Sequence, residues 1–174
     1  MAKNIFEPLK DLQGNALRGA SWYRNAVSLI VDQVSQRKLM SQGKVNASPS
    51  AGRMNLFVYD PKYKKTLPFY DTFPLVLPLE TIKGGFMGLN FHYLPYALRA
   101  RLLDAAGQDK LNVQEVKRSR LTKPTIKRYL FGYVKSMFLK IEDEDNLTAI
   151  MLPVQRFKKA NETKVWADSR RIAR

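Results

Sequence analysis

The sequence has no cysteine and a single histidine, and these two shortages exclude several kinds of site. Without cysteine there is no disulfide framework and no thiolate ligand for a metal, which agrees with a reducing compartment. A classical zinc site needs several histidine or cysteine ligands, and His92 alone cannot supply them. We therefore expect neither a bound metal nor any other cofactor.

Long apolar runs are also missing. The longest, Phe73 to Leu79, is far shorter than the roughly 20 residues that a membrane-spanning helix needs. The first residues, Met1 to Pro8, include no apolar signal region, so we expect synthesis in the cytosol and no membrane partner. Hydrophobic residues nevertheless make up 45% of the chain, which is ordinary for a globular core.

No constellation of residues typical of an enzyme is present. A Ser-His-Asp triad through His92 lacks the G-x-S-x-G motif around any serine, and we expect this histidine to pack at a strand end. The acidic run Glu142–Asp145 has neither the alternating ligands nor the mid-loop glycine of a calcium loop. We interpret it as a solvated loop or as an internal counter-charge for a basic surface. The sequence thus predicts no catalytic residues.

Positive charge is what the chain has in excess. Thirty Lys and Arg against fifteen Asp and Glu give a net charge of +15 and a sequence pI of about 10.1. Residues 113–174 hold fifteen of these bases against seven acids, so we expect the basic face in the C-terminal third. Such a field attracts nucleic acids, acidic protein surfaces and anionic membranes.

Six bases lie within twelve positions of this third and form the candidate contact for phosphate or for an acidic partner. They are Lys117, Arg118, Arg120, Lys123, Lys127 and Arg128. If Pro124 opens a helix, the last two fall in its first turns, where backbone N–H groups favour an anion. No RNP, zinc-finger or homeodomain pattern accompanies them, so charge alone does not separate DNA from an acidic protein.

The first third of the chain reads as an arm, a helix and a linker. Residues 1–19 lack periodicity, and an arm that orders on a partner is the expected structure. Ser21 can cap a helix whose apolar face starts at Trp22 and extends to Val34 or Leu39. The small and polar residues 41–52 predict a loop. We therefore divide the chain into an N-terminal arm, helix and linker (1–52) and a compact domain (53–174).

The middle of the chain predicts strands. Residues 54–59 are rich in strand formers, and residues 86–91 can pair back after the turn at residues 83–85. Residues 67–80 are extended, but three prolines in them delete ladder donors. We therefore place this segment at a sheet edge or in irregular structure.

The later part of the chain predicts mainly helices. Pro95 is well placed to start a helix that ends near Gly107, and Pro124 to start another that extends to Phe138. Residues 147–152 read as a strand, and Pro153 as the start of a short helix. Together these elements predict an α+β fold, with a small antiparallel sheet, packed helices and an extended N-terminal arm.

Aromatic residues are concentrated between residues 57 and 96, interleaved with proline. Packing in the core accounts for the alternating ones, and an interface accounts for the remainder, because aromatic side chains often anchor interfaces. The candidate interface residues are Phe69, Tyr70, Phe73, Trp22 and Trp166.

Three blocks of sequence carry a resemblance to a known family. The first runs from Phe57 to Leu75 as FVYDPKYKKTLPFYDTFPL, the second from Gly84 to Leu102, and the third, VWADSRR, ends at Arg171. Together they resemble a family of small virion-associated proteins of contractile-tailed (T4-like) bacteriophages, from about residue 22 to the C-terminus. The resemblance implies a component of the tail or baseplate, or of the set that completes heads and protects DNA ends. It carries over no catalytic residue.

These observations predict a non-enzymatic structural subunit of a tailed-phage virion, with the tail or baseplate as the preferred position. It would be made in the cytoplasm of the host bacterium and act through interfaces with other virion proteins in a symmetric assembly. The alternative is a DNA-binding head-completion or DNA-end-protecting protein, for which the six bases would contact phosphates. A nuclease acting through Glu142–Asp145 is a third hypothesis.

Overall fold

The structure, a computed structural model, describes residues 35–107 and 110–174. Within them, six strands form one sheet in the order β1-β7-β2-β4-β5-β6, with every neighbouring pair antiparallel. Their bounds are β1 (Val45–Asn46), β2 (Asn55–Leu56), β4 (Leu75–Ile82), β5 (Gly85–Asn90), β6 (Ile126–Leu130) and β7 (Phe138–Lys140). A second sheet pairs β3 (Tyr70–Asp71) with β8 (Phe157–Lys158).

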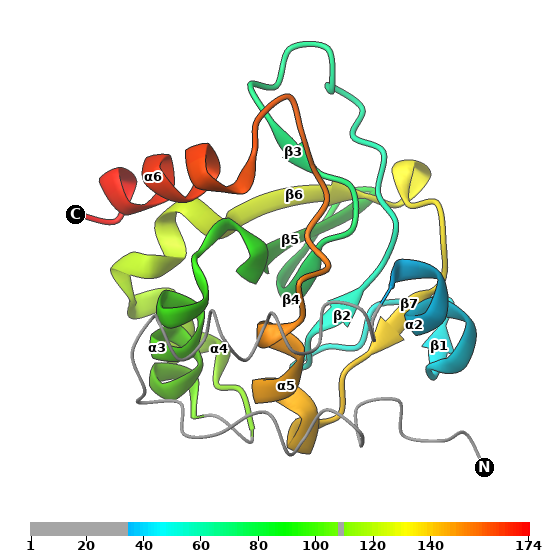
Figure 1. The fold of residues 1–174 in the computed structure, drawn as a ribbon. Helices are drawn as coiled ribbons and strands as arrows, with labels where there is room; N and C mark the ends of the chain where they lie inside the picture. Colours follow the sequence, from blue (N-terminus) through cyan, green and yellow to red (C-terminus); the bar gives the residue numbers. More distant parts are fainter. Residues whose placement is uncertain (1–34, 108–109) are drawn as a thin grey trace.

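Helices and short 3-10 turns connect and cover these strands (Figure 1). The helices are α2 (Gln36–Gln42), α3 (Tyr96–Ala106), α4 (Val113–Arg118), α5 (Asn146–Met151) and α6 (Glu162–Ile172). The 3-10 turns are η2 (Phe91–Tyr93), η3 (Arg120–Thr125), η4 (Phe131–Tyr133) and η5 (Asp143–Asp145). Helices packed on a small antiparallel sheet confirm the predicted α+β class.

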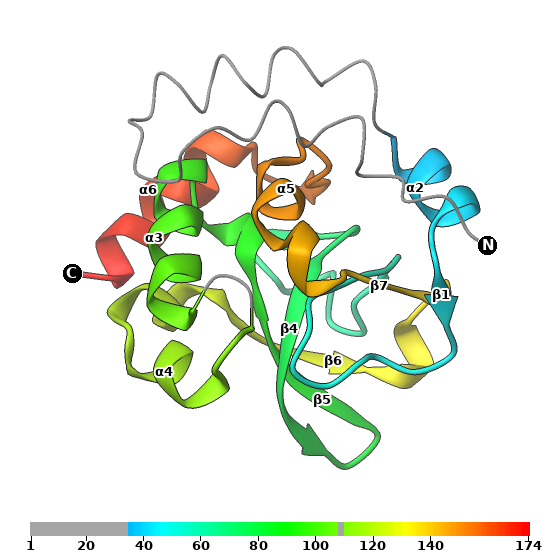
Figure 2. The same cartoon turned by 90° about the horizontal axis from the view of Figure 1, so that it is seen from below.

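The two faces of the large sheet bury different side chains. On one face, Leu75, Leu77 and Leu89 pack beneath α3 and α5, which lie side by side in Figure 2. On the other face, Val76 contacts a cluster of rings, which we call the aromatic cluster. Its members are Phe57, Tyr59, Phe86, Tyr129 and Phe138. Their ring centroids lie 4.8 to 6.3 Å apart, within the range in which aromatic pairs attract.

Several predicted elements are confirmed. Helix α3 begins directly after Pro95 and ends at Gly107, whose φ of +98° is the left-handed conformation that glycine adopts without steric cost. The predicted turn at residues 83–85 joins β4 to β5, and Gly84 has a φ of +76°. The strand expected at residues 54–59 is present as β2, followed by an isolated bridge from Tyr59 to Val134.

The edge position expected for residues 67–80 is wrong for their second half. Strand β4 lies between β2 and β5, in the interior of the sheet. It tolerates Pro78 because β2 pairs only with Leu75 and Val76, so the proline has a neighbour on one side only. A register shift between Pro78 and Glu80 relieves the missing ladder donor.

The helix expected from Pro124 to Phe138 is wrong, and strand β6 stands in its place. Pro124 lies inside the 3-10 turn η3, and β6 pairs with β5 from Gly85 to Leu89. Gly132 would interrupt a helix, and the β-branched and aromatic residues around Tyr129 favour a pleated strand. The buried tyrosine then completes the aromatic cluster.

Two assignments near the C-terminus are also wrong. Residues 147–152, expected as a strand, belong mostly to α5, because a short apolar run fits a buried helix as well as a buried strand. The segment after Pro153 is extended rather than helical, because the backbone carbonyl of Arg156 accepts a hydrogen bond from the backbone N–H of Thr72 (2.9 Å). This contact leads into the β3–β8 pair.

The predicted arm and most of the helix from Ser21 lie outside the described residues. The expected loop at residues 41–52 is largely present, but Val45 and Asn46 form β1 and pair with β7. The division of the chain at residue 52 stays a prediction.

We predict that Gly88→Ala lowers the free energy of unfolding by about 1–3 kcal/mol, the usual effect of overpacking a core. A Cβ atom at this position would lie 2.2 Å from Val76 Cγ1 and 3.3 Å from Phe86 Cε2. Urea denaturation followed by tryptophan fluorescence measures the change. The control is Gly132→Ala, where no atom lies within 4 Å and no loss is expected. Equal stabilities for the two variants would show that Gly88 is not packed closely against Val76 and Phe86.

Candidate nucleic-acid interface

The structure distributes the six predicted basic residues over two neighbouring regions. Lys117 and Arg118 end α4, Arg120 and Lys123 lie on η3, and all four are exposed. The other two, Lys127 and Arg128, lie on β6 instead of in a helix, so the expected helix N-terminus for an anion is absent there.

Within the part of the chain that the structure describes, most of these cations have no acidic partner. Arg118 pairs with Glu115 at 2.9 Å on the surface of α4, where such a pair contributes little to stability. For the other five, no carboxylate lies within ion-pair distance among the described residues. Uncompensated cations on a surface are what phosphate groups bind.

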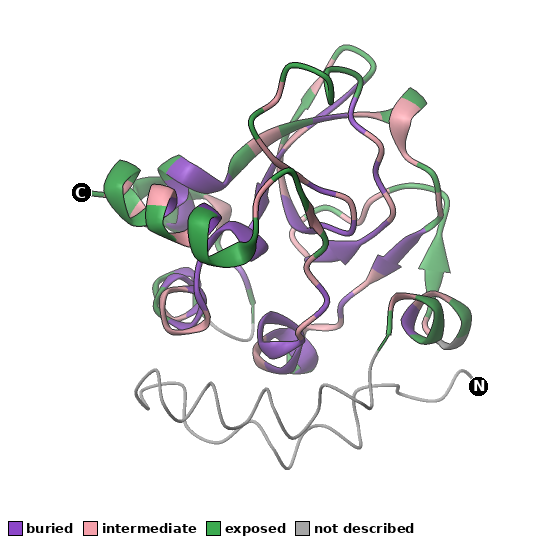
Figure 3. Cartoon of the chain, turned by 45° about the horizontal axis from the view of Figure 1, so that its top comes forward, coloured by how far each residue is buried: buried purple, intermediate pink, exposed green. Residues whose placement is uncertain are grey.

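Helix α6 adds further basic residues beside this region. It contacts η3, and its Arg170 and Arg171 are exposed. Lys164 and Arg171 share Asp168 at 2.9 and 3.4 Å, whereas no described acid pairs with Arg170. Figure 3 shows α6 and the neighbouring loops as a largely exposed rim around the buried sheet. The cations of α4, η3, β6 and α6 form what we call the basic surface.

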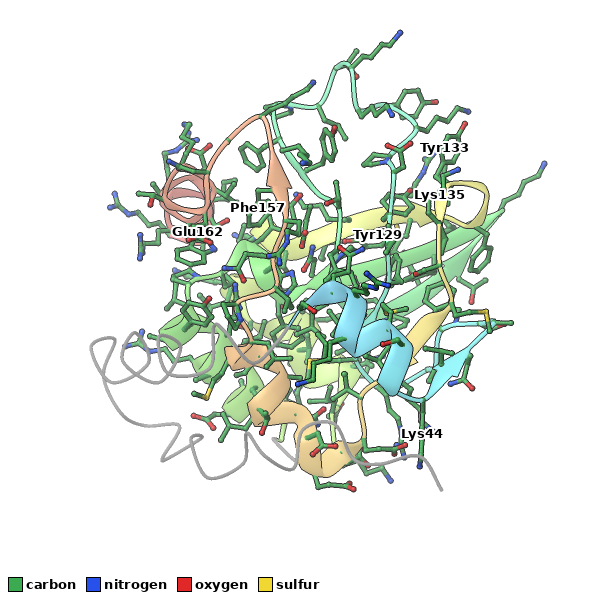
Figure 4. All side chains as sticks on the ribbon, turned by 45° about the vertical axis from the view of Figure 1, so that its right-hand side comes forward. Lys44, Tyr129, Tyr133, Lys135, Phe157 and Glu162 are labelled. Atoms are coloured by element: carbon green, nitrogen blue, oxygen red, sulfur yellow. The ribbon has the colours of Figure 1, made fainter. Side chains whose placement is uncertain are left out.

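A cavity of about 510 Å³ lies between β6 and the loop of residues 61–69, and we call it the aromatic pocket. Its walls include the rings of Tyr63, Phe69 and Tyr93, with Tyr129 of the aromatic cluster behind them. Figure 4 shows Tyr129 in the middle of the molecule, beneath this loop.

Basic residues line the same pocket. Lys127 Nζ lies 4.1 Å from the centroid of the Tyr93 ring, a cation–π distance, and Lys62 Nζ lies 5.4 Å from that of Tyr63. Burial lowers the pKa of the Lys127 ammonium, and no described carboxylate compensates it. Arg128 is exposed at the pocket.

The loop that forms the outer wall is held at several points. The backbone N–H groups of Thr66 and Leu67 both donate to the carbonyl of Tyr63, at 3.0 and 3.1 Å. Lys159, which has a φ of +70°, donates from Nζ to the carbonyls of Lys64 and Leu67. The wall is therefore built from ordered backbone rather than from a free loop.

A buried carboxylate holds the base of this loop. Asp71 Oδ1 accepts hydrogen bonds from the backbone N–H groups of Phe73 and Arg156, each at 3.0 Å. Its Oδ2 accepts from Asn90 Nδ2 at 3.0 Å and from His92 Nδ1 at 2.7 Å. Burial alone would raise the pKa of Asp71, but its contact with His92 and the hydrogen bonds from Asn90 and the backbone of Arg156 hold it below its usual value. The residue is therefore an ionised, fully bonded anchor.

His92 is neutral in this arrangement. Burial lowers its pKa by more than the carboxylate of Asp71 raises it. Its Nε2 atom is buried and has no hydrogen-bond partner among the described residues, so a second ring proton would have no acceptor there. The histidine is fully buried, as the sequence predicted for a packed residue, and cannot meet a substrate in this structure.

A fully buried arginine extends the network to the helices. Arg99 donates to the carbonyl oxygens of Leu94 (2.7 Å) and Ile150 (2.9 Å), and its guanidinium carbon lies 4.4 Å from the Tyr96 ring centroid. Trp166 Nε1 donates to the carbonyl of His92 at 2.9 Å and so fastens α6 to the same centre. Neither Asp71 nor Arg99 was predicted from the sequence as a structural centre, although both lie in the blocks that carry the family resemblance.

The five predicted interface residues have different surroundings. Phe69 and Tyr70 are half-buried at the aromatic pocket, and Trp166 is half-buried with its N–H already bonded. Phe73 is completely buried in the core, because it follows the anchored Asp71, so it is not an interface residue. Trp22 lies outside the described residues.

Two residues of the acidic run Glu142–Asp145 form ion pairs within the protein. Glu142 pairs with Arg53 and, at 3.2 Å, with Lys140, while Asp143 lies 3.8 Å from the same arginine. Asp145 is buried. Within the described ranges, no group of three or more His, Asp or Glu residues could hold a metal ion.

Fold and site together define a small, basic α+β protein with an exposed cationic surface and an aromatic pocket. Residues 14–169 match the family described as phage T4 terminal DNA protecting protein. The chain therefore belongs to this phage family. The match agrees with the resemblance to T4-like phage proteins, and it supports the DNA-end alternative better than a tail or baseplate component.

No curated protein and no solved structure matches the chain. In residues 35–107 and 110–174, none of the helices is both long and apolar enough to span a bilayer.

We predict that acid weakens the fold through its single histidine. The unfolded chain binds a proton on His92 near pH 6.5, whereas the folded protein does so only at lower pH. The free energy of unfolding should therefore fall as the pH drops below about 6.5, by up to about 1.4 kcal/mol per pH unit. Urea denaturation between pH 8 and about pH 5 measures this slope.

The variant His92→Asn is the control for this prediction. Its amide can still donate to Asp71, but it does not titrate. The variant should be less stable than the natural protein, with a flatter pH dependence above the range in which carboxylates titrate. An unchanged slope of the unfolding free energy against pH would show that His92 is not the source of the pH dependence.

Proposed function

We propose that this protein binds the ends of duplex DNA of a phage and shields them from exonucleases. The family match over residues 14–169 carries the proposal. The net charge of +15 supports it, because a strongly basic protein attracts the phosphate backbone and releases its counterions. DNA is thus the partner that we assign to the basic surface.

The bases of α4 and η3 are the proposed phosphate contacts. Arg120 and Lys123 are exposed and have no described carboxylate within ion-pair distance, so DNA would not have to displace an internal partner. They are held in place by η3, whose Thr122, Pro124 and Thr125 are buried. Lys127 and Arg128 continue the same surface onto β6.

We propose further that the protein is non-enzymatic and travels with the particle. The burial of His92 and the ion pairs of Glu142 support the first point, because neither side chain is available to activate a nucleophile. Exposed Phe131 and Met137 offer contacts for other virion proteins. No feature of the described residues favours a tail or baseplate position over one at the DNA.

We predict that the double variant Arg120→Gln/Lys123→Gln binds linear duplex DNA more weakly and with a shallower salt dependence. Loss of two phosphate contacts should reduce the slope of log K against log salt by about 2. Fluorescence anisotropy over a range of salt concentrations measures the slope. An exonuclease digestion of linear DNA, with and without protein, measures the protection.

The matched control is Arg37→Gln/Lys44→Gln. Arg37 is exposed on α2, and Lys44 is exposed directly before β1, the edge strand opposite β6. Lys44 lies far from the 61–69 loop in Figure 4. This variant should keep the natural salt slope and the natural protection. If the unaltered protein neither binds linear duplex DNA at low salt nor slows its digestion, the proposed function is wrong.

A further inference from the structure

We infer that the aromatic pocket binds the unpaired terminal nucleotide of a DNA strand, with its base against the rings and its phosphate at Lys127 and Arg128. This inference rests on the proposed function, since it names the part of the DNA end that the protein recognises. Three features of the pocket carry it, namely its size, its rings and its uncompensated cations.

The size of the pocket fits one nucleotide. A cavity of about 510 Å³ lies within the range that holds a single small ligand, whereas a base pair with both backbones is too large for it. A base must therefore leave its duplex before it enters. Unpairing costs least where a base is already single-stranded or lies at a frayed end, so a pocket of this kind favours ends over internal positions.

The rings are placed for a base. Tyr63 is 55% exposed on the outer wall, although a large aromatic side chain gains nothing from water there. Phe69 and Tyr70, both half-buried, line the same space. Every base has a flat π-face, so such a platform accepts any terminal nucleotide without reading its sequence.

The cations are placed for its phosphate. Lys127 is half-buried beside Tyr93 without a described carboxylate partner. The single carboxylate of the pocket wall, Asp71, accepts hydrogen bonds from four other donors and forms no ion pair with Lys127. A bound phosphate would supply the missing negative charge. Burial lowers the pKa of Lys127, because it disfavours the charged form of the ammonium group.

An acidic peptide could also pair with the cations of the pocket, but it would not stack on the aromatic rings. A nucleotide contacts both the cations and the rings. The observations therefore favour the nucleotide, and the peptide becomes an outcome of the test.

The test compares two forms of one duplex with the full-length protein, by fluorescence anisotropy. One form has both ends closed by hairpin loops, and the other has a short single-stranded overhang at one end. The natural protein should prefer the overhang by about 10-fold, the usual contribution of stacking one base on an aromatic side chain. Tyr63→Ala should abolish this preference while keeping the affinity for the closed form.

Phe131→Ala is the matched control, because Phe131 is similarly exposed, at 47%, and does not line the pocket. It should keep the preference. Thymidine 5′-monophosphate should displace the overhang from the natural protein, and Lys127→Gln should weaken that competition, whereas exposed Lys135→Gln should not.

The outcomes separate this inference from the proposed function. Binding and protection of duplex ends without any preference for the overhang would overturn the inference and leave the proposed function standing. Displacement by inorganic phosphate or by polyglutamate as effective as that by thymidine 5′-monophosphate would overturn it too, in favour of an anion or acidic-protein site. Absence of binding to either duplex would remove the proposed function itself.

Discussion

The fold of this protein depends on one buried carboxylate. Asp71 receives four hydrogen bonds, from Phe73, Asn90, His92 and the backbone of Arg156, and these donors belong to chain segments far apart in the sequence. A buried charge is tolerated only when it is bonded in this way, and removal of its donors leaves a large desolvation cost. The carboxylate thereby ties the start of β4, the end of β5 and the approach to β8 into one unit.

The same hydrogen-bonded unit positions the outer wall of the aromatic pocket and helix α6. Strand β3 follows the loop of residues 61–69 and ends at Asp71, so the buried contacts of this carboxylate fix the position of the outer wall of the aromatic pocket. Helix α6 follows β8 and is fastened by Trp166 to the carbonyl of His92. A site assembled on such a centre needs no ordering when a ligand arrives, which favours binding.

Ion pairs are unevenly distributed over the described part of the protein. The acids of residues 142–143 are paired with Arg53 and Lys140 near β2 and β7. Bases on α4, η3 and β6 have few such partners among the described residues. Charge of one sign destabilises a folded chain through self-repulsion, so a surface that stays uncompensated is explained by a partner that neutralises it. For a member of the terminal DNA protecting family, DNA is the partner that we propose.

The predictions from sequence were correct where the backbone preference of a single residue decides the local conformation. Pro95 and Gly107 bound a helix because one has a fixed φ and the other adopts a positive one, and Gly84 makes a turn for the second reason. The segment 124–138 failed, because the spacing of Ile126, Tyr129 and Leu130 suits a helix as well as a strand. Pairing with β5 decided between them.

The sequence by itself determined the class of protein: a basic, cysteine-free α+β chain with a cluster of bases and with blocks typical of a phage family. Only the tertiary structure decided which of those residues meet. Asp71 and His92 are separated by twenty-one positions, and Tyr63 and Lys127 come from a loop and a strand far apart in the chain. Burial, hydrogen bonding and pairing between such segments are properties of the assembled core. No local pattern of side chains can encode them.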